Sequence, residues 1–325
     1  MERKRKSKGI LIGSVLTALF AGIAFLLSMG SDNSGNDDSQ VSQDLTKKLE
    51  CEGQVYEYNK DLMNILFLGI DKDAELVEQD GPRTAGQSDC IMILSLNKET
   101  KEGRILQIPR DTMTEVDMYD KNGNYYNSVV RQITTQFAFG VGGENSCWAV
   151  KKTVSELLYD LPIDGYFAID MAGVSIITDA IGGVTITIPE DYTHIDSTFI
   201  KGETVTLNGE QAERYIRYRD IDVMFSNNDR MERQTQFIPA LVSALKQKVG
   251  GNGNYVNVLL PLVDEYMITD LREDQLNSLA DYELMMSDIQ TLPGEGKMGE
   301  VHEEFHVDQE KLLKNVAEMF YILKE

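Results

Sequence analysis

The hydrophobic positions predict three buried strands at the start of the folded part. Residues 63–71, MNILFLGID, form a continuous apolar run that ends at an acid, and residues 90–97 and 104–112 contain two more runs. Unbroken apolar runs of this length are typical of strands covered on both faces. Polar side chains stand at the ends of the runs: Asp71, Asp89, Arg110 and Asp111. If these ends meet, they form a polar site at one edge of a sheet.

Helix and strand patterns alternate further along the chain. Residues 145–159 predict a helix, and residues 166–171 predict a short strand. Residues 171–183 predict a helix that ends at two glycines, and residues 184–190, VTITIPE, predict another strand. This order predicts an α/β fold or a mixed α+β fold. Aromatic and aliphatic residues in this region are expected to pack in the core: Tyr125, Tyr126, Trp148, Val150, Val154 and Leu157.

Capping residues predict where the later helices begin. Asn208 and Gln211 have the spacing of a capping box. A second helix is expected from about Asn228, with Pro239 interrupting it. Asp308 is expected to cap the last helix.

The N-terminal segment has the pattern of a membrane anchor. Residues 9–30 contain no charged side chain and follow a basic segment. About twenty apolar residues suffice to cross a bilayer as a helix, and the basic flank predicts a cytoplasmic N-terminus with the remaining chain outside the cell. A cleaved signal peptide is the alternative, but the apolar run is long for one and no A-x-A site follows it. We therefore expect an uncleaved, single-pass anchor in the cell membrane.

Arginines cluster in a chain that is otherwise strongly acidic. The chain has 31 Lys and Arg against 53 Asp and Glu, a net charge of −22, and such a surface repels nucleic acid. Residues 208–236 nevertheless hold five arginines: Arg214, Arg217, Arg219, Arg230 and Arg233. Such a cluster is stabilised by an anion between its members or by acidic neighbours. Arginine also binds phosphate through two parallel hydrogen bonds.

The spacing of these arginines indicates two elements. Arg217 and Arg219 point to one face of an extended segment. Arg230, Arg233 and Gln234 share one face of a helix. The two elements together could surround one anion. The alternative is a solvated charged face that nearby acids neutralise.

Asp71 and Asp89 are candidate ligands for a divalent cation. Mg²⁺ is commonly held by one or two carboxylates and completes its shell with water and substrate phosphates, and Mn²⁺ is the alternative. A cation and the arginines together would neutralise the charge on a departing phosphate. Ordinary turn or capping acids are the competing interpretation.

One histidine pair matches a zinc motif. His302 and His306 lie in HEEFH, which fits H-E-x-x-H only if the segment is helical. If Asp308 caps the last helix, the segment is extended and the two histidines lie roughly 13 Å apart, too far to share one ion. We interpret the match as chance.

The three cysteines show no metal-site spacing. No C-x-x-C pair occurs, and the number of cysteines is odd. Three reduced, mostly buried thiols are expected, and one disulfide with a free thiol is the alternative. The residues are Cys51, Cys90 and Cys147.

Several segments, taken in order, resemble the LytR-CpsA-Psr (LCP) family over residues 62–246. They are NILFLGID, SDCIMILSLN, ILQIPRDT, IDGYFAIDMAGVSIITDAIGGVTITIPE, LNGEQAERYIRYR and RMERQ, preceded by the expected anchor. The resemblance implies a central mixed sheet flanked by helices, with a hydrophobic tunnel for lipid. The expected division is a cytoplasmic tail (1–9), an anchor (10–30), a polar extracellular linker (31–60), an LCP-type catalytic domain (61–247) and a C-terminal segment (248–325) that packs on or extends that domain.

The resemblance also implies an activity in Gram-positive envelope assembly. Family members look like transferases that move a glycopolymer phosphate from a polyprenyl-pyrophosphate carrier to peptidoglycan, typically to the C6 hydroxyl of N-acetylmuramic acid. Wall teichoic acid, capsule and other polysaccharides remain open as the polymer. The alternatives are hydrolysis of the same carrier, and a protein that binds the lipid-linked polymer or regulates its synthesis without chemistry.

Site residues follow from the matching motifs. Asp71 and Asp89 match acids linked to Mg²⁺, and either is a candidate acceptor for the hydroxyl proton. The remaining matches are with pyrophosphate-binding side chains: Arg110, Arg217, Arg219, Arg230 and Gln234, with Arg233 beside them. Two positions depart from the family pattern. Gln87 stands where an arginine is common, so that one phosphate contact is missing or Arg83 replaces it, and Asn227 stands where the family often has glycine.

Overall fold

The computed structural model describes residues 47–72, 86–220, 226–250, 261–272, 275, 282–284 and 289–324. The expected cytoplasmic tail, the expected anchor and most of the expected linker lie outside these residues. Among the helices within them, none is both long and apolar enough to cross a membrane.

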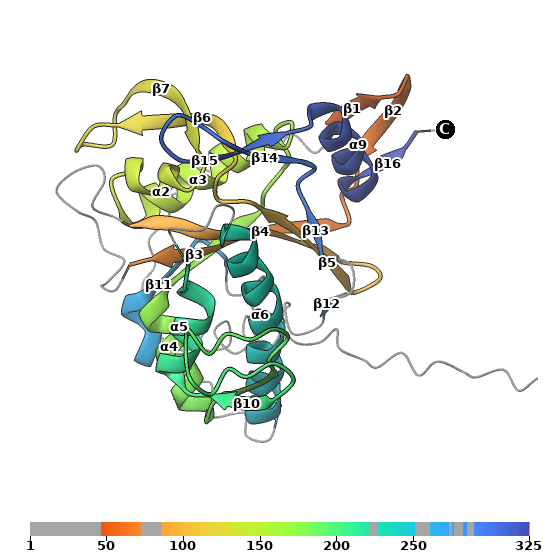
Figure 1. The fold of residues 1–325 in the computed structure, drawn as a ribbon. Helices are drawn as coiled ribbons and strands as arrows, with labels where there is room; N and C mark the ends of the chain where they lie inside the picture. Colours follow the sequence, from red (N-terminus) through yellow and green to blue (C-terminus); the bar gives the residue numbers. More distant parts are fainter. Residues whose placement is uncertain are drawn as a thin grey trace, which may run out of the picture.

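A mixed seven-stranded sheet forms the centre of the fold (Figure 1). Its strand order is β11-β8-β3-β4-β5-β12, and β13 also pairs with β5. The β3–β4, β4–β5 and β8–β11 pairs are antiparallel, whereas β3–β8, β5–β12 and β5–β13 are parallel. The strands are β3 (Leu62–Asp71), β4 (Gln87–Asn97), β5 (Glu102–Ile108), β8 (Gly165–Asp170), β11 (Met267–Thr269), β12 (Glu283–Leu284) and β13 (Gln290–Thr291). The predicted mixed sheet is therefore confirmed.

Antiparallel pairing brings the polar ends of β3, β4 and β5 to one edge of the sheet. Asp71 pairs with Gln87, and Ile91 pairs with Ile108, two residues before Arg110. The register shifts between Gly69, which faces Cys90, and Ile70, which faces Ser88. Asp89 is thus the extra residue of a β-bulge. Bulges of this kind re-aim a side chain and are common beside active sites.

Two separate cores explain the unbroken apolar runs. Successive side chains of a strand point to opposite faces. Ile65 and Phe67 pack in one core, and Leu66 and Leu68 pack in the other. The first core is shared with α4 (Met171–Ile181), α5 (Gly209–Arg217) and α6 (Ser226–Gly250), and the second with α3 (Gly143–Leu157) and α9 (Gln309–Phe320).

Smaller sheets and hairpins surround the central sheet. The β6–β7 hairpin, followed by α2, lies with α3 on the side opposite α4–α6 (Figure 1). The VTITIPE segment forms a short strand in a two-stranded sheet rather than joining the central one. The remaining elements are β6 (Met113–Tyr119), β7 (Tyr125–Gln132), α2 (Thr135–Phe139), β9 (Val184–Thr187), β10 (Thr204–Leu207), η1 (Asp264–Tyr266), β14 (Gly294–Met298) and β15 (Glu303–Val307).

Both ends of the described chain belong to this folded unit. β1 (Lys48–Cys51), β2 (Gln54–Tyr58) and β16 (Tyr321–Leu323) form a three-stranded sheet. Regular structure therefore begins before residue 61, inside the range expected to be linker. The expected boundary after residue 247 falls inside α6. The segment that follows supplies β11, β12 and β13 to the central sheet.

The predicted helix caps are present. Asn208 and Gln211 form the capping box of α5, with the Asn208 side chain accepting from Gln211 N at 2.8 Å. Asp308 caps α9 by accepting from Lys311 N at 3.1 Å. The expected interruption at Pro239 is wrong, because α6 continues to Gly250.

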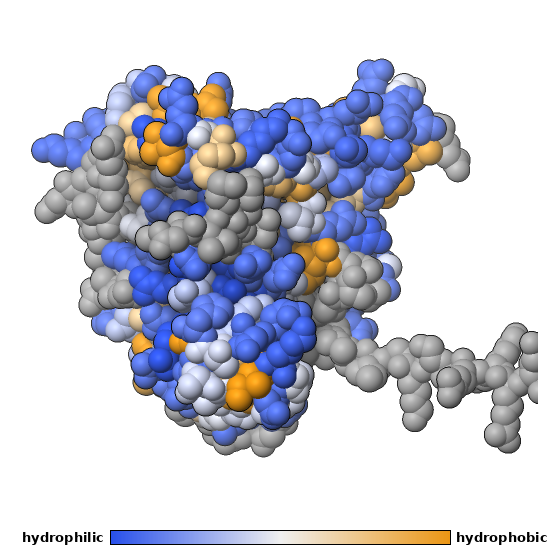
Figure 2. Space-filling view, viewed as in Figure 1, coloured by the Kyte–Doolittle hydropathy of each residue, from blue (hydrophilic) through white to orange (hydrophobic). Residues whose placement is uncertain are grey.

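Some expected core residues are exposed instead. Val150 and Val154 are buried, but Trp148 is 51% exposed, Tyr125 58% and Tyr126 54%. All three cysteines are buried and none is joined to another, which confirms their predicted burial. The exposed aromatics lie on α3 and the β6–β7 hairpin. Figure 2 shows a largely hydrophilic face with a few small hydrophobic patches.

Candidate active site

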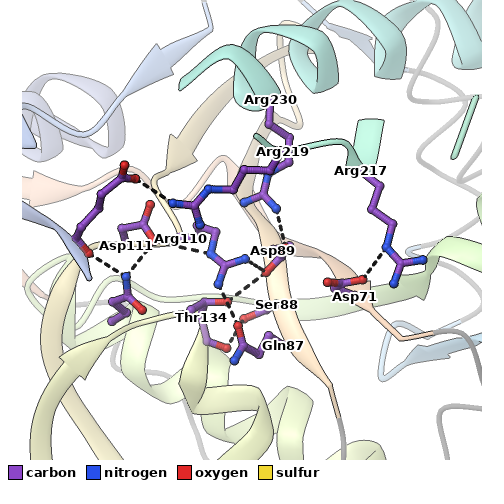
Figure 3. A network of polar contacts seen from close by, with 12 residues as sticks. Asp71, Gln87, Ser88, Asp89, Arg110, Asp111, Thr134, Arg217, Arg219 and Arg230 are labelled. Atoms are coloured by element: carbon purple, nitrogen blue, oxygen red, sulfur yellow. Dashed lines mark hydrogen bonds and ion pairs between the residues drawn. The ribbon is translucent and has the colours of Figure 1, made fainter. Parts of the chain in front are cut away.

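Asp89 lies at the centre of a network of polar contacts at the sheet edge (Figure 3). The bulge directs its carboxylate between two arginines that are far apart in the sequence. Arg110 Nη1 donates to one carboxylate oxygen, and Arg230 Nη1 donates to the other at 2.6 Å. Thr134 Oγ1 lies 3.2 Å from the first oxygen and donates to it. Asp89 and Arg230 are only 5% and 4% exposed, so this ion pair is buried.

Arg110 connects β4 with the turn after β5. Its Nη2 donates to Gln87 Oε1 at 2.8 Å, and its Nε lies 3.5 Å from Asp111 Oδ1. Gln87, which departs from the family pattern, therefore holds Arg110 in position in this chain. Arg83, its expected substitute, lies outside the described residues.

Arg217 and Asp71 form a second, more open pair. Arg217 Nε lies 3.0 Å from Asp71 Oδ1, and Arg217 Nη1 donates to Glu213 Oε1 at 3.0 Å. The Arg217 side chain is 38% exposed. The expected extended segment is wrong at this position, since Arg217 is the last residue of α5. The helix end brings Arg217 to Asp71, whereas Arg219 follows in the next segment and points to the Asp111 side of the same network (Figure 3).

Arg219 contacts a residue from the C-terminal part of the chain. Its Nη2 donates to Glu303 Oε2 at 2.8 Å, and Glu303 is 7% exposed. Gln132 Nε2 donates both to the Glu303 carbonyl, at 2.7 Å, and to Asp111 Oδ1, at 2.8 Å. Glu303, Gln132 and Thr134 were missed in the sequence, because no local pattern joins them to the arginines.

The HEEFH segment thus contributes through its first glutamate. Glu303, Glu304 and His306 lie in β15, an extended strand, as the position of the Asp308 cap predicted. His302 and His306 are exposed. Extended backbone does not give the helical spacing that the zinc motif requires.

Arg233 and Gln234 donate to backbone carbonyls at the end of α5. Arg233 donates to the Tyr215 carbonyl, from Nε at 2.7 Å, and to the Tyr218 carbonyl, and Gln234 Nε2 donates to the Ile216 carbonyl at 3.1 Å. Both side chains are buried. These bonds fix α6 to the end of α5, next to Arg217.

The arginine cluster is therefore split between two roles. Arg214 pairs with Asp196 at 3.0 Å on the outer side of α5, as a solvated charged face predicts. Arg110, Arg217, Arg219 and Arg230 each lie against a carboxylate at the sheet edge: Asp89, Asp71, Glu303 and Asp89 again. The side chain of Asn227 is outside the described residues.

Burial perturbs two of the carboxyl groups. Desolvation raises the pKa of Asp71, and the neighbouring charge of Asp89 raises it further, against the opposing effect of Arg217, Arg230 and Arg110. Desolvation also raises the pKa of Asp111, although Arg110 and Arg219 oppose this. Acids with raised pKa values at a polar cleft are typical of functional sites.

Asp71 and Asp89 are the two carboxylates at the sheet edge that could hold a divalent cation, and in this structure both Asp89 oxygens accept from arginines. Asp71 Oδ1 is buried, and its 3.0 Å contact with Arg217 Nε does not have the geometry of a hydrogen bond. These residues contain no group of three or more His, Cys, Asp or Glu side chains that could hold a metal. A site built from Asp71 and Asp89 would therefore suit Mg²⁺, which keeps several waters and substrate oxygens, better than a metal that requires an all-protein cage.

An apolar cavity lies behind the bulge. It lies within the first core, between the sheet and the helices. Its lining includes Phe67, Cys90, Ile216, Gln234 and Phe237. Its volume is about 40 Å³, which is space for only a few water molecules. The described residues therefore show a small apolar cavity but not the expected lipid tunnel.

Comparison with known proteins identifies the family. Residues 25–321 match the sequence profile of the LytR_cpsA_psr family. The chain belongs to the LytR-CpsA-Psr family. It is 30% identical over 305 residues to the polyisoprenyl-teichoic acid–peptidoglycan teichoic acid transferase TagU of Oceanobacillus iheyensis, covering 90% of this chain and 87% of that protein. It is 26% identical over 324 residues to the TagU of Enterococcus faecalis, covering 98% of each.

Solved structures share the fold of this LytR-CpsA-Psr chain. A Streptococcus agalactiae protein superposes with a TM-score of 0.61 at 19% identity, covering 81% of this chain and 90% of that one. TagV of Bacillus subtilis gives a TM-score of 0.57 at 24% identity, with 80% and 96% covered. TagT bound to LI-WTA gives 0.54 at 21% identity, with 80% and 89% covered.

The buried pair predicts a large loss of stability in Asp89→Asn. Removing the charge leaves the buried Arg230 guanidinium without its carboxylate, which typically costs about 3–5 kcal/mol. Urea unfolding followed by circular dichroism measures this loss. Glu190→Gln is the matched control, because Glu190 pairs with Lys201 at 2.6 Å on the surface and both side chains are more than half exposed. We expect little change there, and equal effects of the two substitutions would contradict a buried charge network.

Asp71→Asn should have the opposite effect at neutral pH. A carboxyl with a higher pKa in the folded than in the unfolded chain loses folding free energy as the pH rises from the unfolded toward the folded pKa. Without divalent cation, the variant should therefore be more stable than the unchanged chain at pH 7. Its advantage should shrink as the pH is lowered toward about 4, the ordinary range of a carboxyl. Urea unfolding in EDTA at several pH values measures this, and a variant less stable at pH 7 would show that the Arg217 pair outweighs burial.

Proposed function

We propose that this protein is a cell-envelope glycopolymer transferase. It moves a glycopolymer phosphate from a polyprenyl-pyrophosphate carrier to peptidoglycan, at the C6 hydroxyl of N-acetylmuramic acid. The observation that carries the proposal is the convergence of Arg110, Arg217, Arg219 and Arg230 on one sheet edge, next to an apolar cavity. The names of the TagU relatives support transfer of teichoic acid rather than another polymer.

The exposed arginines are the first contacts for the pyrophosphate. The side chains of Arg217 and Arg219 are 38% and 27% exposed, whereas Arg230 is almost completely buried. Phosphate oxygens would replace Asp71 and Glu303 as partners of the two exposed arginines, since guanidinium groups bind carboxylate and phosphate with the same geometry. Arg230 and Arg110 would then stabilise the negative charge that develops on the leaving polyprenyl phosphate.

The assignment of Mg²⁺ rests on Asp71 and Asp89, which would hold the ion. When bound, the ion neutralises negative charge on phosphate oxygens. Loss of transfer in EDTA and recovery with Mg²⁺ tests this assignment, and full activity in EDTA would contradict it.

An aspartate is the proposed acceptor of the proton from the sugar hydroxyl. Asp89 already accepts hydrogen bonds from Arg110, Arg230 and Thr134. Asp71 has a pKa raised by burial and by Asp89, which moves it toward the range that suits a general base. This difference favours Asp71 over Asp89 for the proton transfer.

The apolar cavity is the proposed entry point of the polyprenyl chain. Its wall is formed by aliphatic and aromatic side chains of the sheet, α4 and α6. A volume of about 40 Å³ cannot hold the chain, so binding requires that α6 and the sheet separate. An N-terminal anchor would keep the domain at the outer surface of the cell membrane, where the lipid carrier lies.

Arg217→Ala should lower transfer about 10- to 100-fold, because it removes a charged contact to the pyrophosphate, and such a contact contributes about 1.5–3 kcal/mol. Arg214→Ala is the matched control, because Arg214 lies on the same helix but pairs with Asp196 and Glu210 away from the site. The assay measures labelled glycan phosphate attached to peptidoglycan by the full chain. Equal activity of the two variants would overturn the assignment of the site.

The same assay separates transfer from hydrolysis. A transferase consumes the lipid-linked polymer only when the peptidoglycan acceptor is present. Release of free phosphorylated glycan at the same rate without acceptor would identify the protein as a hydrolase. Tight binding with no consumption in either case would identify a non-catalytic binding protein.

A further inference from the structure

A second, larger pocket lies on the side of the sheet opposite α4–α6. It is formed between the β6–β7 hairpin, α3 and the start of α9 (Figure 1). Its volume is about 700 Å³, within the roughly 300–1,000 Å³ of pockets that bind small ligands. None of the arginines assigned to the pyrophosphate lines this pocket.

One wall of the pocket is aromatic. Trp148 lies edge-on to Tyr119, with ring centroids 6.3 Å apart, and Tyr125 also lies edge-on to Tyr119, at 6.2 Å. Tyr119 is buried, whereas Trp148 and Tyr125 are each more than half exposed. Large exposed aromatic surface is costly in water unless a ligand covers it, and aromatic side chains with a polar edge are common at such sites.

The same elements carry polar groups next to the aromatic side chains. Asp117 accepts from Ser128 Oγ at 2.5 Å and from Lys152 Nζ at 2.8 Å, and Lys152 also pairs with Glu156 at 2.7 Å. Burial by itself would raise the pKa of Asp117, but the hydrogen bonds from Lys152 and Ser128 outweigh it and hold this pKa low. The carboxylate therefore stays charged as a hydrogen-bond acceptor.

Backbone strain is found at one end of the pocket. Tyr159 has φ of 60° and Asp160 has φ of 53°, a left-handed conformation that is unfavourable for residues other than glycine. The Tyr159 hydroxyl donates to the Gln309 carbonyl at 2.9 Å and so links the end of α3 to the start of α9. Strained residues of this kind are concentrated at ligand sites.

We propose that this pocket binds a neutral glycan, with pyranose rings packed on Trp148 and Tyr125. The face of a sugar ring presents C–H groups that pack on aromatic rings, and its hydroxyls donate to carboxylates such as Asp117 and Glu156. The lining holds three acids, Glu115, Asp117 and Glu156, against one base, Lys152. This balance repels phosphate-containing polymers and nucleic acids and selects an uncharged ligand. The site is separate from the pyrophosphate site, and the proposal does not depend on the transferase activity.

The sole tryptophan of the chain provides a direct probe of this pocket. The full chain, kept in a sugar-free detergent, is titrated with chitotetraose, a neutral oligomer of N-acetylglucosamine, while Trp148 fluorescence is recorded. We expect a saturable change in fluorescence. Poly(glycerol phosphate) at the same concentrations should cause none, and a saturable change with this anionic polymer instead would overturn the assignment of a neutral ligand.

Two tyrosines of the hairpin give a matched pair of variants. Tyr125→Ala removes a side chain that lines the pocket, and Tyr126→Ala removes an equally exposed neighbour that does not. Calorimetric titration, which does not rely on Trp148, should show at least tenfold weaker chitotetraose binding in Tyr125→Ala and unchanged binding in Tyr126→Ala. Circular dichroism verifies that both variants fold. Absence of saturable binding in the unchanged chain, or equal binding in the two variants, would refute the site.

Discussion

The buried ion pairs of Asp89 are the constraint on which the site depends. Arg110 comes from the turn after β5 and Arg230 from α6, 120 residues later, and both donate to this carboxylate. Burying charged groups is unfavourable unless each finds a partner, so the arrangement is stable only when all three segments are in place. The β-bulge makes this geometry accessible, because without the extra residue the carboxylate would point to the other face of β4.

The rest of the site is arranged around this network. Arg233 and Gln234 hold α6 against the backbone of α5, which brings the end of α5, with Arg217, to Asp71. Glu303 comes from the C-terminal part of the chain and balances Arg219. Each arginine at the sheet edge is thus matched by a carboxylate within the chain. A bound pyrophosphate must compete with these internal anions, and this competition favours a ligand of higher charge than a single carboxylate.

Local sequence patterns were sufficient for the strands, the caps and the position of the sheet-edge acids. The apolar run ending at Asp71 and the capping box at Asn208 depend on neighbours in the sequence, and both are present in the structure. Arg217 and Arg219 are two residues apart, a spacing that is compatible with a strand. In the structure, however, the helix that begins at the capping box extends as far as Arg217. Glu303 and Gln132 could not be predicted, because their contacts join segments 171 residues apart.

Trp148 is exposed rather than buried in the core for a similar reason. Trp148 has helical core spacing with Val150 and Val154, yet α3 packs on the sheet through the valines and directs the tryptophan toward the hairpin. Periodicity identifies an apolar face but does not determine which residue lies at its margin. The two pockets that result lie on opposite sides of the sheet, one beside the arginines and one beside the aromatics.

A crystal structure of the chain with geranyl pyrophosphate and Mn²⁺ tests the central claim most directly. The account predicts phosphate oxygens within hydrogen-bonding distance of Arg217, Arg219 and Arg110. It also predicts an anomalous Mn²⁺ peak between Asp71 and Asp89, and the geranyl chain in a widened cavity beside Phe237. Density for the pyrophosphate elsewhere on the molecule, with the pairs of Asp89, Asp71 and Glu303 unchanged, would contradict it.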